Sequence, residues 1–377
     1  MKHIVIVGAG GAGLCLLESL LRTFKSPIKI TVLDAHPESH RDRTWCRWLP
    51  ADELQAYHTA HWSRIRVGAP GYSDTLLTKK LVYAYASGGN FRDHVVGLSD
   101  GRHEVEWIRK NATGFGYDGP GQAHVYMGKE RLTCDWIFTS WYPGQRVTSG
   151  LWQQFHGWVV ETDHPVFEPD TMTLMDFDID QPKTAVLFSY VLPFDPNVAL
   201  VELTQFTKSG WSDAQYDAQL EVLMRKRYLL EPGQYRIRSV ESGKIPMDPI
   251  PYPGQPNPAT FPIGTVAGAV KPSTGYAFAR MQRTCAHLVS TLHKEGRPRY
   301  PQASAGRFKL YDLLLLRILR EKPAQGVRIF RALFSRVPID LVFRFLDEST
   351  RLRQEISIFR RLPITPFLNS LWKHVIS

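Results

Sequence analysis

The chain has 377 residues, of which 43% are hydrophobic, and a formal net charge of +10 at pH 7. This length is enough for two or three domains with a sizeable core. The four cysteines are far apart and form no C-x-x-C pair, so neither a disulfide framework nor a structural zinc site is expected. No apolar run reaches about 18 residues, so no membrane-spanning helix is expected.

The first predicted element is a buried strand that leads into a glycine-rich turn. Residues 4–13 read Ile-Val-Ile-Val-Gly-Ala-Gly-Gly-Ala-Gly, which gives Gly8, Gly10 and Gly13 the G-x-G-x-x-G spacing. Gly8 permits a tight turn, Gly10 lets a pyrophosphate approach the backbone, and Gly13 allows close packing of the next helix. That helix is expected over 14–24, with its N-terminus toward the phosphates. Because the predicted strand begins at residue 4, we expect no signal peptide before it. We also expect a cytoplasmic protein whose cysteines are reduced thiols.

A second strand is predicted over 28–33, and it ends at Asp34. This acid lies 21 residues after Gly13, about where a carboxylate binds an adenosine ribose hydroxyl. A glycine-rich turn without a ligand is the simpler alternative. A strand before the glycines, a helix after them and an acid at this distance together favour a dinucleotide site.

Residues 36–50 have the composition of a polar, turn-rich loop. Strand-like alternation follows at 104–108, 123–127 and 136–140, as expected for a small sheet and a return to the main one. Further strands are predicted at 157–162, 171–177, 185–192, 199–206 and 234–240, with one helix at 213–230. This pattern favours an antiparallel substrate-binding sheet, which the Pro-rich residues 245–260 bring to an end.

A second glycine-containing turn begins at Gly264 and precedes a helix expected over 277–293. It includes Gly268, Pro272, Thr274 and Gly275. In a flavoprotein, such a helix start can direct backbone N–H groups at the edge of the flavin that is negatively charged when reduced. An NAD enzyme needs no second site of this kind near its C-terminus. The second turn therefore favours FAD as the cofactor.

Most of the positive charge lies near the C-terminus. Residues 306–377 contain 14 Lys and Arg against 6 Asp and Glu, a net charge of +8, so the first 305 residues contribute only +2. Apolar segments at 310–319, 327–334, 337–346 and 356–371 alternate with these bases and predict amphipathic helices. They either pack on the body with arginines outward or also rest on anionic lipid. Nucleic acid is disfavoured as a partner because the bases alternate with aliphatic residues.

Five segments follow from these elements. The expected boundaries are 1–85 for the first part of an FAD-binding domain, 86–154 for a mixed part that returns to it, 155–250 for the substrate-binding sheet, 255–300 for the second FAD-binding part and 301–377 for a basic amphipathic helical region.

Several motifs, in the same order along the chain, resemble the flavin-dependent lycopene cyclases of the bacterial and plant β-cyclase type. Two positions depart from the family pattern: Arg47 replaces an aromatic residue, and Leu203 replaces the second glutamate of F-L-E-E-T. The matching segments are D-R-T-W-C-R-W at 42–48, F-H-G-W at 155–158, L-M-D-F at 174–177, Y-V-L-P-F at 190–194, A-L-V-E-L-T at 199–204, G-K-I-P-M at 243–247, the second glycine turn at 268–276 and F-L-D-E at 345–348.

The resemblance implies an α/β fold: a Rossmann-like FAD-binding domain of the p-hydroxybenzoate hydroxylase architecture, an antiparallel-sheet substrate domain and a C-terminal helical region. It also implies a carotenoid substrate and cyclisation by acid–base catalysis through a carbocation, without net redox change. Such enzymes need reduced FAD, for which NAD(P)H is the expected reductant. An insoluble hydrocarbon substrate implies a cytoplasmic enzyme that associates peripherally with membranes through 306–377.

Glu202 matches the first glutamate of F-L-E-E-T and is the lone acid in an apolar strand. A carboxyl group that burial keeps neutral can donate a proton, so Glu202 is the first candidate catalytic residue and Asp176 the second. Glu241 is either structural or a supporting residue.

Arg43 and Thr44 lie where a loop would cover the cofactor, so either they contact the FAD phosphates or the flavin, or Arg43 forms a surface ion pair with Asp42. Trp45, Trp48, Trp158 and Tyr276 either line a polyene tunnel or belong to the core. No metal site is predicted, because His58, His61 and His156 lack metal-ligand spacing.

Two alternatives remain open. A flavin hydroxylase or oxidoreductase of similar architecture would use NAD(P)H and oxygen, but such enzymes carry a mid-sequence D-G motif that is not recognisable here: Asp135 is followed by Trp136, and Asp118-Gly119 lies in a Gly/Pro loop. The other alternative is a polyene- or flavin-binding protein without catalysis. A cyclase acting on a different linear polyene is a variant of the favoured interpretation.

Overall fold

A five-stranded parallel sheet forms around the N-terminal strand in the computed structural model, which describes residues 1–144, 149–249, 254–302 and 305–376. Its order is β18 (Thr260–Pro262), β12 (Trp136–Thr139), β1 (His3–Val7), β2 (Lys29–Leu33) and β8 (Glu104–Ile108). Strands of a parallel sheet are covered on both faces, which is why residues 4–7 form an uninterrupted apolar run.

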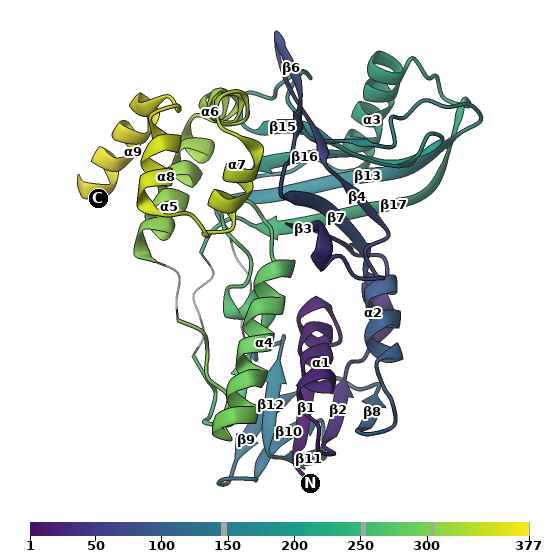
Figure 1. Ribbon diagram of the computed structural model, residues 1–377, viewed down its shortest axis with the longest axis vertical. Helices are drawn as coiled ribbons and strands as arrows, with labels where there is room; N and C mark the ends of the chain where they lie inside the picture. The colour runs from purple at the N-terminus through teal and green to yellow at the C-terminus, as the bar shows by residue number, and fades with distance from the viewer. Residues whose placement is uncertain (145–148, 250–253, 303–304, 377) are drawn as a thin grey trace.

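Helices cover one face of this sheet and a small sheet covers the other (Figure 1). Side chains of α1 (Gly11–Thr23) and α4 (Phe278–Glu295) form one core with Ile4, Ile6 and Ile30. On the opposite face, the sheet formed by β9 (Gly114–Tyr117), β10 (Ala123–Met127) and β11 (Glu130–Cys134) packs on Val5 and Val7. The segment 255–300 thus returns to the first sheet, since β18 pairs with β12 and α4 packs on α1.

A seven-stranded sheet forms the second lobe. In spatial order its strands are β17 (Tyr235–Pro246), β13 (Trp152–Thr162), β16 (Val198–Thr207), β15 (Val186–Asp195), β14 (Thr171–Asp176), β5 (Arg64–Ala69) and β6 (Tyr72–Leu77). All neighbours are antiparallel except β14 and β5. Helix α3 (Asp213–Tyr228) packs on one face, and C-terminal helices pack on the other. The predicted α/β fold with a second, largely antiparallel sheet is confirmed.

The structure differs from expectation between residues 36 and 97. The predicted polar loop contains β3 (Thr44–Pro50), which pairs with β7 (Leu81–Ser87) in a sheet that also holds β4 (Ala60–Trp62). The prediction of a loop was wrong for 44–50. Arg43 and Arg47 make this part of the sequence look polar, but it also contains aromatic residues that pack against the protein, and Trp45 stacks on Phe278. Strands β5 and β6 lie within 1–85, which was expected to belong to the first domain, yet they extend the seven-stranded sheet. Helix α2 (Gly88–Gly97) follows β7.

The C-terminal region is helical, as predicted. Its helices are α5 (Gly306–Glu321), α6 (Pro323–Arg336), α7 (Ile339–Leu346), α8 (Leu352–Phe359) and α9 (Ile364–Ile376). The predicted segment 356–371 is interrupted because Pro363 disfavours a helical conformation at Leu362. Within the described part of the chain, no helix has the length and apolar character needed to cross a bilayer. Residues 250–253 of the Pro-rich stretch lie outside the described residues.

A buried ion cluster joins these helices to the second glycine turn. Lys271 is 4% exposed, and its Nζ lies 2.9 Å from both carboxylate oxygens of Asp312 on α5. The same Nζ lies 2.9 Å from Oε1 of Glu348, which follows α7 and also pairs with Arg280 at 3.2 Å. Lys271 therefore compensates the buried Asp312 and the partly buried Glu348 on different C-terminal segments.

We expect Lys271→Met to destabilise the attachment of the C-terminal helices. Removing one partner from a buried ion cluster leaves uncompensated charge and costs about 3–5 kcal/mol. The thermal midpoint should fall, and amide hydrogen exchange in α5 should accelerate. Lys309→Met, at an exposed lysine on the same helix, is the matched control and should change neither. Equal midpoints for the two variants would contradict a stabilising role for the cluster.

Candidate active site

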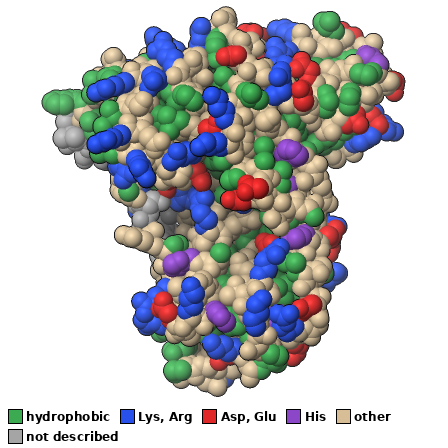
Figure 2. Space-filling model, in the orientation of Figure 1, with side chains coloured by type: hydrophobic (Ala, Val, Ile, Leu, Met, Phe, Trp, Pro, Cys, Tyr) green, Lys and Arg blue, Asp and Glu red, His purple; other side chains and the backbone are tan. Residues whose placement is uncertain are grey.

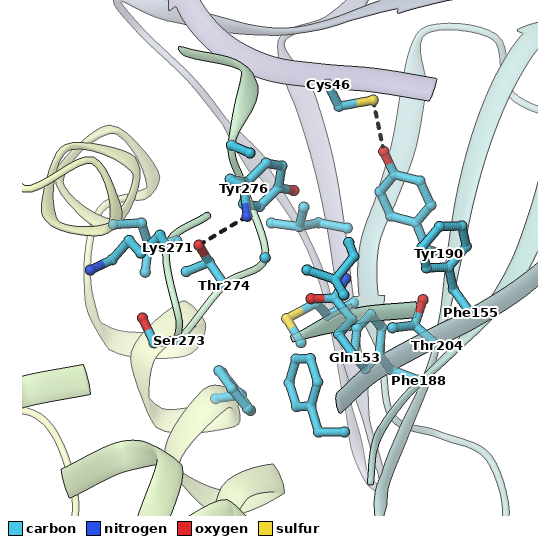
Figure 3. A pocket seen from close by; sticks show the side chains of 18 of the residues that line it. Cys46, Gln153, Phe155, Phe188, Tyr190, Thr204, Lys271, Ser273, Thr274 and Tyr276 are labelled. Atoms are coloured by element: carbon cyan, nitrogen blue, oxygen red, sulfur yellow. Dashed lines mark hydrogen bonds between the residues drawn. The ribbon is translucent and has the colours of Figure 1, made fainter. Parts of the chain in front are cut away.

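A cavity of about 560 Å³ lies between the seven-stranded sheet, β3, the second glycine turn and the C-terminal helices. Figure 3 shows Gln153, Phe155 and Thr204 on the sheet side and Ser273 and Thr274 on the opposite side. The end formed by the C-terminal helices is strongly aromatic, with Phe308, Tyr311, Phe330, Phe334, Phe343, Phe345, Phe359 and Phe367. Such a lining suits an extended apolar ligand.

Two glutamates meet on the wall formed by the sheet. Glu202 on β16 and Glu241 on β17 are both opposite Gly157, which lies on the strand between them. Residues directly opposite one another in a sheet share a face, so both carboxyl groups project to the same side. Gly157 leaves the intervening space open: a Cβ at this position would lie 2.9 Å from Cβ of Glu202. Both glutamates line the cavity.

Burial is the main influence on the pKa values of the two glutamates. Glu202 is 7% exposed, and desolvation, followed by the nearby Glu241, raises its pKa well above the usual range. Burial also raises the pKa of Glu241, but a hydrogen bond from Thr44, one with Glu202 and the charge of Arg43 act against this shift. Thr204 donates a hydrogen bond to Oε1 of Glu202. The site can hold a neutral carboxyl group beside a second carboxyl group.

A network of hydroxyl groups begins on the next strand of the sheet, beside Glu202. Tyr190 on β15 is opposite Glu202, and its hydroxyl donates to Sγ of Cys46 at 3.3 Å. The hydroxyl oxygen of Tyr83 lies 2.9 Å from that of Tyr190 and 2.7 Å from that of Tyr276. Burial raises the pKa of Cys46 to about 12 and raises the pKa of Tyr83 well above its usual range. These groups stay uncharged near neutral pH.

The predicted glycine motif forms a turn whose packing requires glycine. Gly8 has φ +97°, and a Cβ at Gly13 would lie 1.9 Å from the carbonyl oxygen of Gly8. Gly10 precedes α1, whose described first turn contains no acidic residue. Asp34 accepts hydrogen bonds from the backbone N–H of Ala9 at 2.6 Å and of His36 at 2.7 Å. A narrow turn with a helix start free of negative charge fits the phosphates of a dinucleotide.

The other predicted cofactor residues converge on the same region. Trp45 covers the glycine turn, since a Cβ at Gly11 would lie 2.8 Å from its ring. Arg43, Thr44, Thr274 and Gly275 line the cavity. Gly275 has φ +73° and faces Gln153, whose Oε1 would lie 2.4 Å from an added Cβ.

Gly268 and Pro272 shape the second glycine turn. Gly268 ends the short helix η3 (Gly264–Ala267) at φ +72°, and Pro272 lies between the buried Lys271 and Ser273. A Cβ at Gly264 would lie 2.8 Å from that of Ala12, so η3 packs against the start of α1. The two glycine turns are therefore neighbours in space, although about 260 residues separate them in the sequence.

Asp176 is not brought to this cavity. It lies on β14 beside a separate pocket next to α3, where Oδ2 is 3.3 Å from a guanidinium nitrogen of Arg227. Trp158 also belongs to the core on the α3 side, and its Nε1 donates to Asp217 at 2.9 Å. Trp45, Trp48 and Tyr276 do line the cavity.

Sequence reasoning gave too little weight to Glu241, Tyr83 and Tyr190. Glu241 is one of several charged residues in an exposed-looking strand, and only its pairing opposite Gly157 distinguishes it. The signal for Glu241 is the glycine of the F-H-G-W segment, because its strand lies between two strands that each carry a glutamate. Strand order cannot be read from a single sequence, so this signal is visible only in the structure.

Comparisons with known proteins agree with this geometry. The family model described as lycopene cyclase protein matches residues 3–372. A lycopene beta-cyclase from a Paracoccus species is 25% identical over 288 residues, which are 74% of this chain and 70% of that protein.

Solved structures with a similar fold include a geranylgeranyl bacteriochlorophyll reductase-like protein from Thermoplasma acidophilum. It has a TM-score of 0.58 and 12% identity, covering 98% of this chain and 96% of that chain. CtdE in complex with FAD and a substrate has a TM-score of 0.56 and 13% identity, covering 88% and 89%. At these identities the likeness confirms the fold.

We expect Glu202→Gln to stabilise the protein above about pH 4.5. The raised pKa of Glu202 means that the native state keeps a proton that the unfolded chain loses above its ordinary pKa of 4.5, so ionisation favours unfolding as pH rises from there. Glutamine cannot ionise. The thermal midpoint of the variant should exceed that of the wild type at pH 7, and the gap should close toward pH 4. A pH-independent difference would contradict this.

Proposed function

The chain belongs to the lycopene cyclase family, and from this premise we propose that it closes the linear ψ-end groups of lycopene into β-rings. The observation that carries this proposal is the buried carboxyl group of Glu202 in a cavity lined by aromatic side chains, where burial raises its pKa. A strong acid in an apolar pocket is what protonation of an alkene requires.

In the proposed reaction, Glu202 gives its proton to C2 of the end group, and C1 becomes cationic. The C5–C6 alkene then closes on C1, forming the C1–C6 bond and leaving the charge at C5. Loss of the C6 proton gives the β-ring. The aromatic faces of Tyr190, Tyr276 and Trp48 are suited to stabilise positive charge, and the surrounding side chains exclude water, which would otherwise trap the cation.

FAD is the proposed cofactor, since both glycine turns and Trp45 fit a dinucleotide. Gly8, Gly10 and Gly13 would receive its phosphates and Asp34 its ribose, while Arg43, Thr44, Thr274 and Gly275 would lie toward its other end. A reduced flavin would supply negative charge that favours the carbocation. NAD(P)H is the proposed reductant, and the reaction itself has no net redox change. We propose no catalytic role for Asp176, because it faces α3.

We also propose that the C-terminal helices rest on a membrane surface. Lys and Arg side chains gather over this part of the molecule, with hydrophobic side chains among them (Figure 2). Phe367 of α9 lines the cavity while its neighbour Leu368 is 58% exposed, so this helix connects the cavity wall to the outer surface. Among the side chains that the structure describes, the large apolar ones exposed on α5, α8 and α9 are Leu313, Leu352, Ile356, Ile364, Leu368, Leu371 and Trp372.

The first test is anaerobic incubation of the purified protein with FAD, dithionite and lycopene in liposomes. We expect an isomer of unchanged mass and a blue-shifted spectrum. Glu202→Gln should lower turnover about 10²–10⁴-fold, the usual contribution of a positioned acid, while lycopene still binds. A variant that cyclises at the wild-type rate would exclude Glu202 as the acid. Oxygen-dependent NAD(P)H consumption with an oxygenated product would instead indicate a hydroxylase.

Leu368→Glu should weaken binding to vesicles that contain anionic lipid. Burying a leucine is worth about 1.5–3 kcal/mol, so we expect roughly a tenfold or greater loss in affinity. Binding of the wild type should also fall with added salt, as screening of the basic residues requires. Leu229→Glu, at an exposed leucine after α3, is the control. If both variants bind like the wild type, this surface does not contact lipid.

A further inference from the structure

We propose that Glu241 is the base that removes a proton from the cyclised end group, and that its position determines which ring is formed. The inference rests on the proposed cyclisation and assigns a second catalytic residue to it. Glu202 and Glu241 would then act as a pair, one giving a proton and the other accepting one.

The placement of Glu241 comes from strand register. Neighbouring strands are about 4.8 Å apart, so positions opposite Gly157 on the two flanking strands are separated by about 10 Å. Two glutamate side chains that extend toward each other cross this gap only if the middle position has no side chain. Gly157 meets that condition. Glu241 also lines the cavity, so its carboxylate faces the same bound end group as Glu202.

The surroundings of the two carboxyl groups fit opposite roles. Thr44 donates a hydrogen bond to Oε2 of Glu241, and the positive charge of Arg43 acts on the same carboxyl group. Both interactions oppose the effect of burial, which raises the pKa of Glu241. At Glu202 burial and the nearby Glu241 act together and raise the pKa well above its usual range, although a hydrogen bond from Thr204 acts against this shift. Two carboxyl groups whose environments differ in this way are commonly an acid and a base.

The location of the base matters because the cation at C5 can lose any of three neighbouring protons. Loss from C6 forms the C5=C6 bond of a β-ring, loss from C4 forms the C4=C5 bond of an ε-ring, and loss from the methyl group forms the exocyclic bond of a γ-ring. A carboxylate fixed by Thr44 can reach one of these positions best. In this proposal, the position of Glu241 therefore determines which ring is formed.

The pair also returns to its starting state without outside reagents. During one cyclisation a proton leaves Glu202 for C2, and an equivalent proton moves from the ring to Glu241. The hydrogen bond between the two carboxyl groups lets that proton pass back to Glu202. No proton is consumed overall.

The test compares the wild type with Glu241→Gln and Glu241→Asp under reduced flavin with lycopene, and separates the isomeric products by chromatography. Glutamine cannot accept the proton, so turnover should fall about 10²-fold or more, and the remaining product should shift from β-rings toward ε- or γ-rings. Aspartate retains a base and should recover part of the rate and of the β-ring. Glu161→Gln removes a carboxyl group at the surface end of β13 and should leave both unchanged.

Flavin binding and thermal midpoints measured on the same samples show whether the variants fold. If Glu241→Gln gives the wild-type ring distribution, at full or reduced rate, Glu241 is not the selecting base. If the wild type itself forms no ring, the proposed function fails, and the failure is not specific to Glu241. A changed distribution from a folded variant supports the assignment, because a purely structural role would lower the amount of active protein without altering the products.

Discussion

The site depends on a pair of carboxyl groups that share the interior of a sheet face. Buried carboxylates are rare, because ionisation in an apolar environment costs free energy. Here burial raises the pKa of both carboxyl groups, which favours the uncharged form, and threonine hydroxyls donate to both, Thr204 to Glu202 and Thr44 to Glu241. Gly157 makes the arrangement possible by leaving the space between them open.

Much of the remaining structure serves to keep this face dry. Helix α3 covers the opposite face of the sheet, so the strands that carry the glutamates are supported from behind. Strand β3 contributes Thr44, which donates a hydrogen bond to Glu241, and Trp45, which covers the glycine turn. Two adjacent residues thus connect the carboxyl pair to the proposed cofactor site. The C-terminal helices close the far side with aromatic rings.

Sequence alone predicted the local features well and the spatial relationships poorly. The glycine turn, Asp34, Glu202 and the C-terminal helices each have a strong local pattern, and the structure contains them where they were expected. Asp176 ends β14 and Glu241 lies in the middle of β17, and nothing local shows that one faces α3 and the other the cavity. A shift of one residue reverses the face of a strand, so that distinction requires the register. The place of β5 and β6 in the second sheet is likewise set by long-range pairing.

Lys271 connects the second glycine turn to the C-terminal helices. It lies three residues before Thr274 in the cofactor turn, and its ion pairs hold the helices that form the aromatic end of the cavity. The second glycine turn and the aromatic end of the cavity thus belong to separate segments that are joined at one lysine. Relatives could acquire longer or shorter polyene substrates by exchanging residues of the C-terminal helices, while the reacting end of the cavity stayed the same.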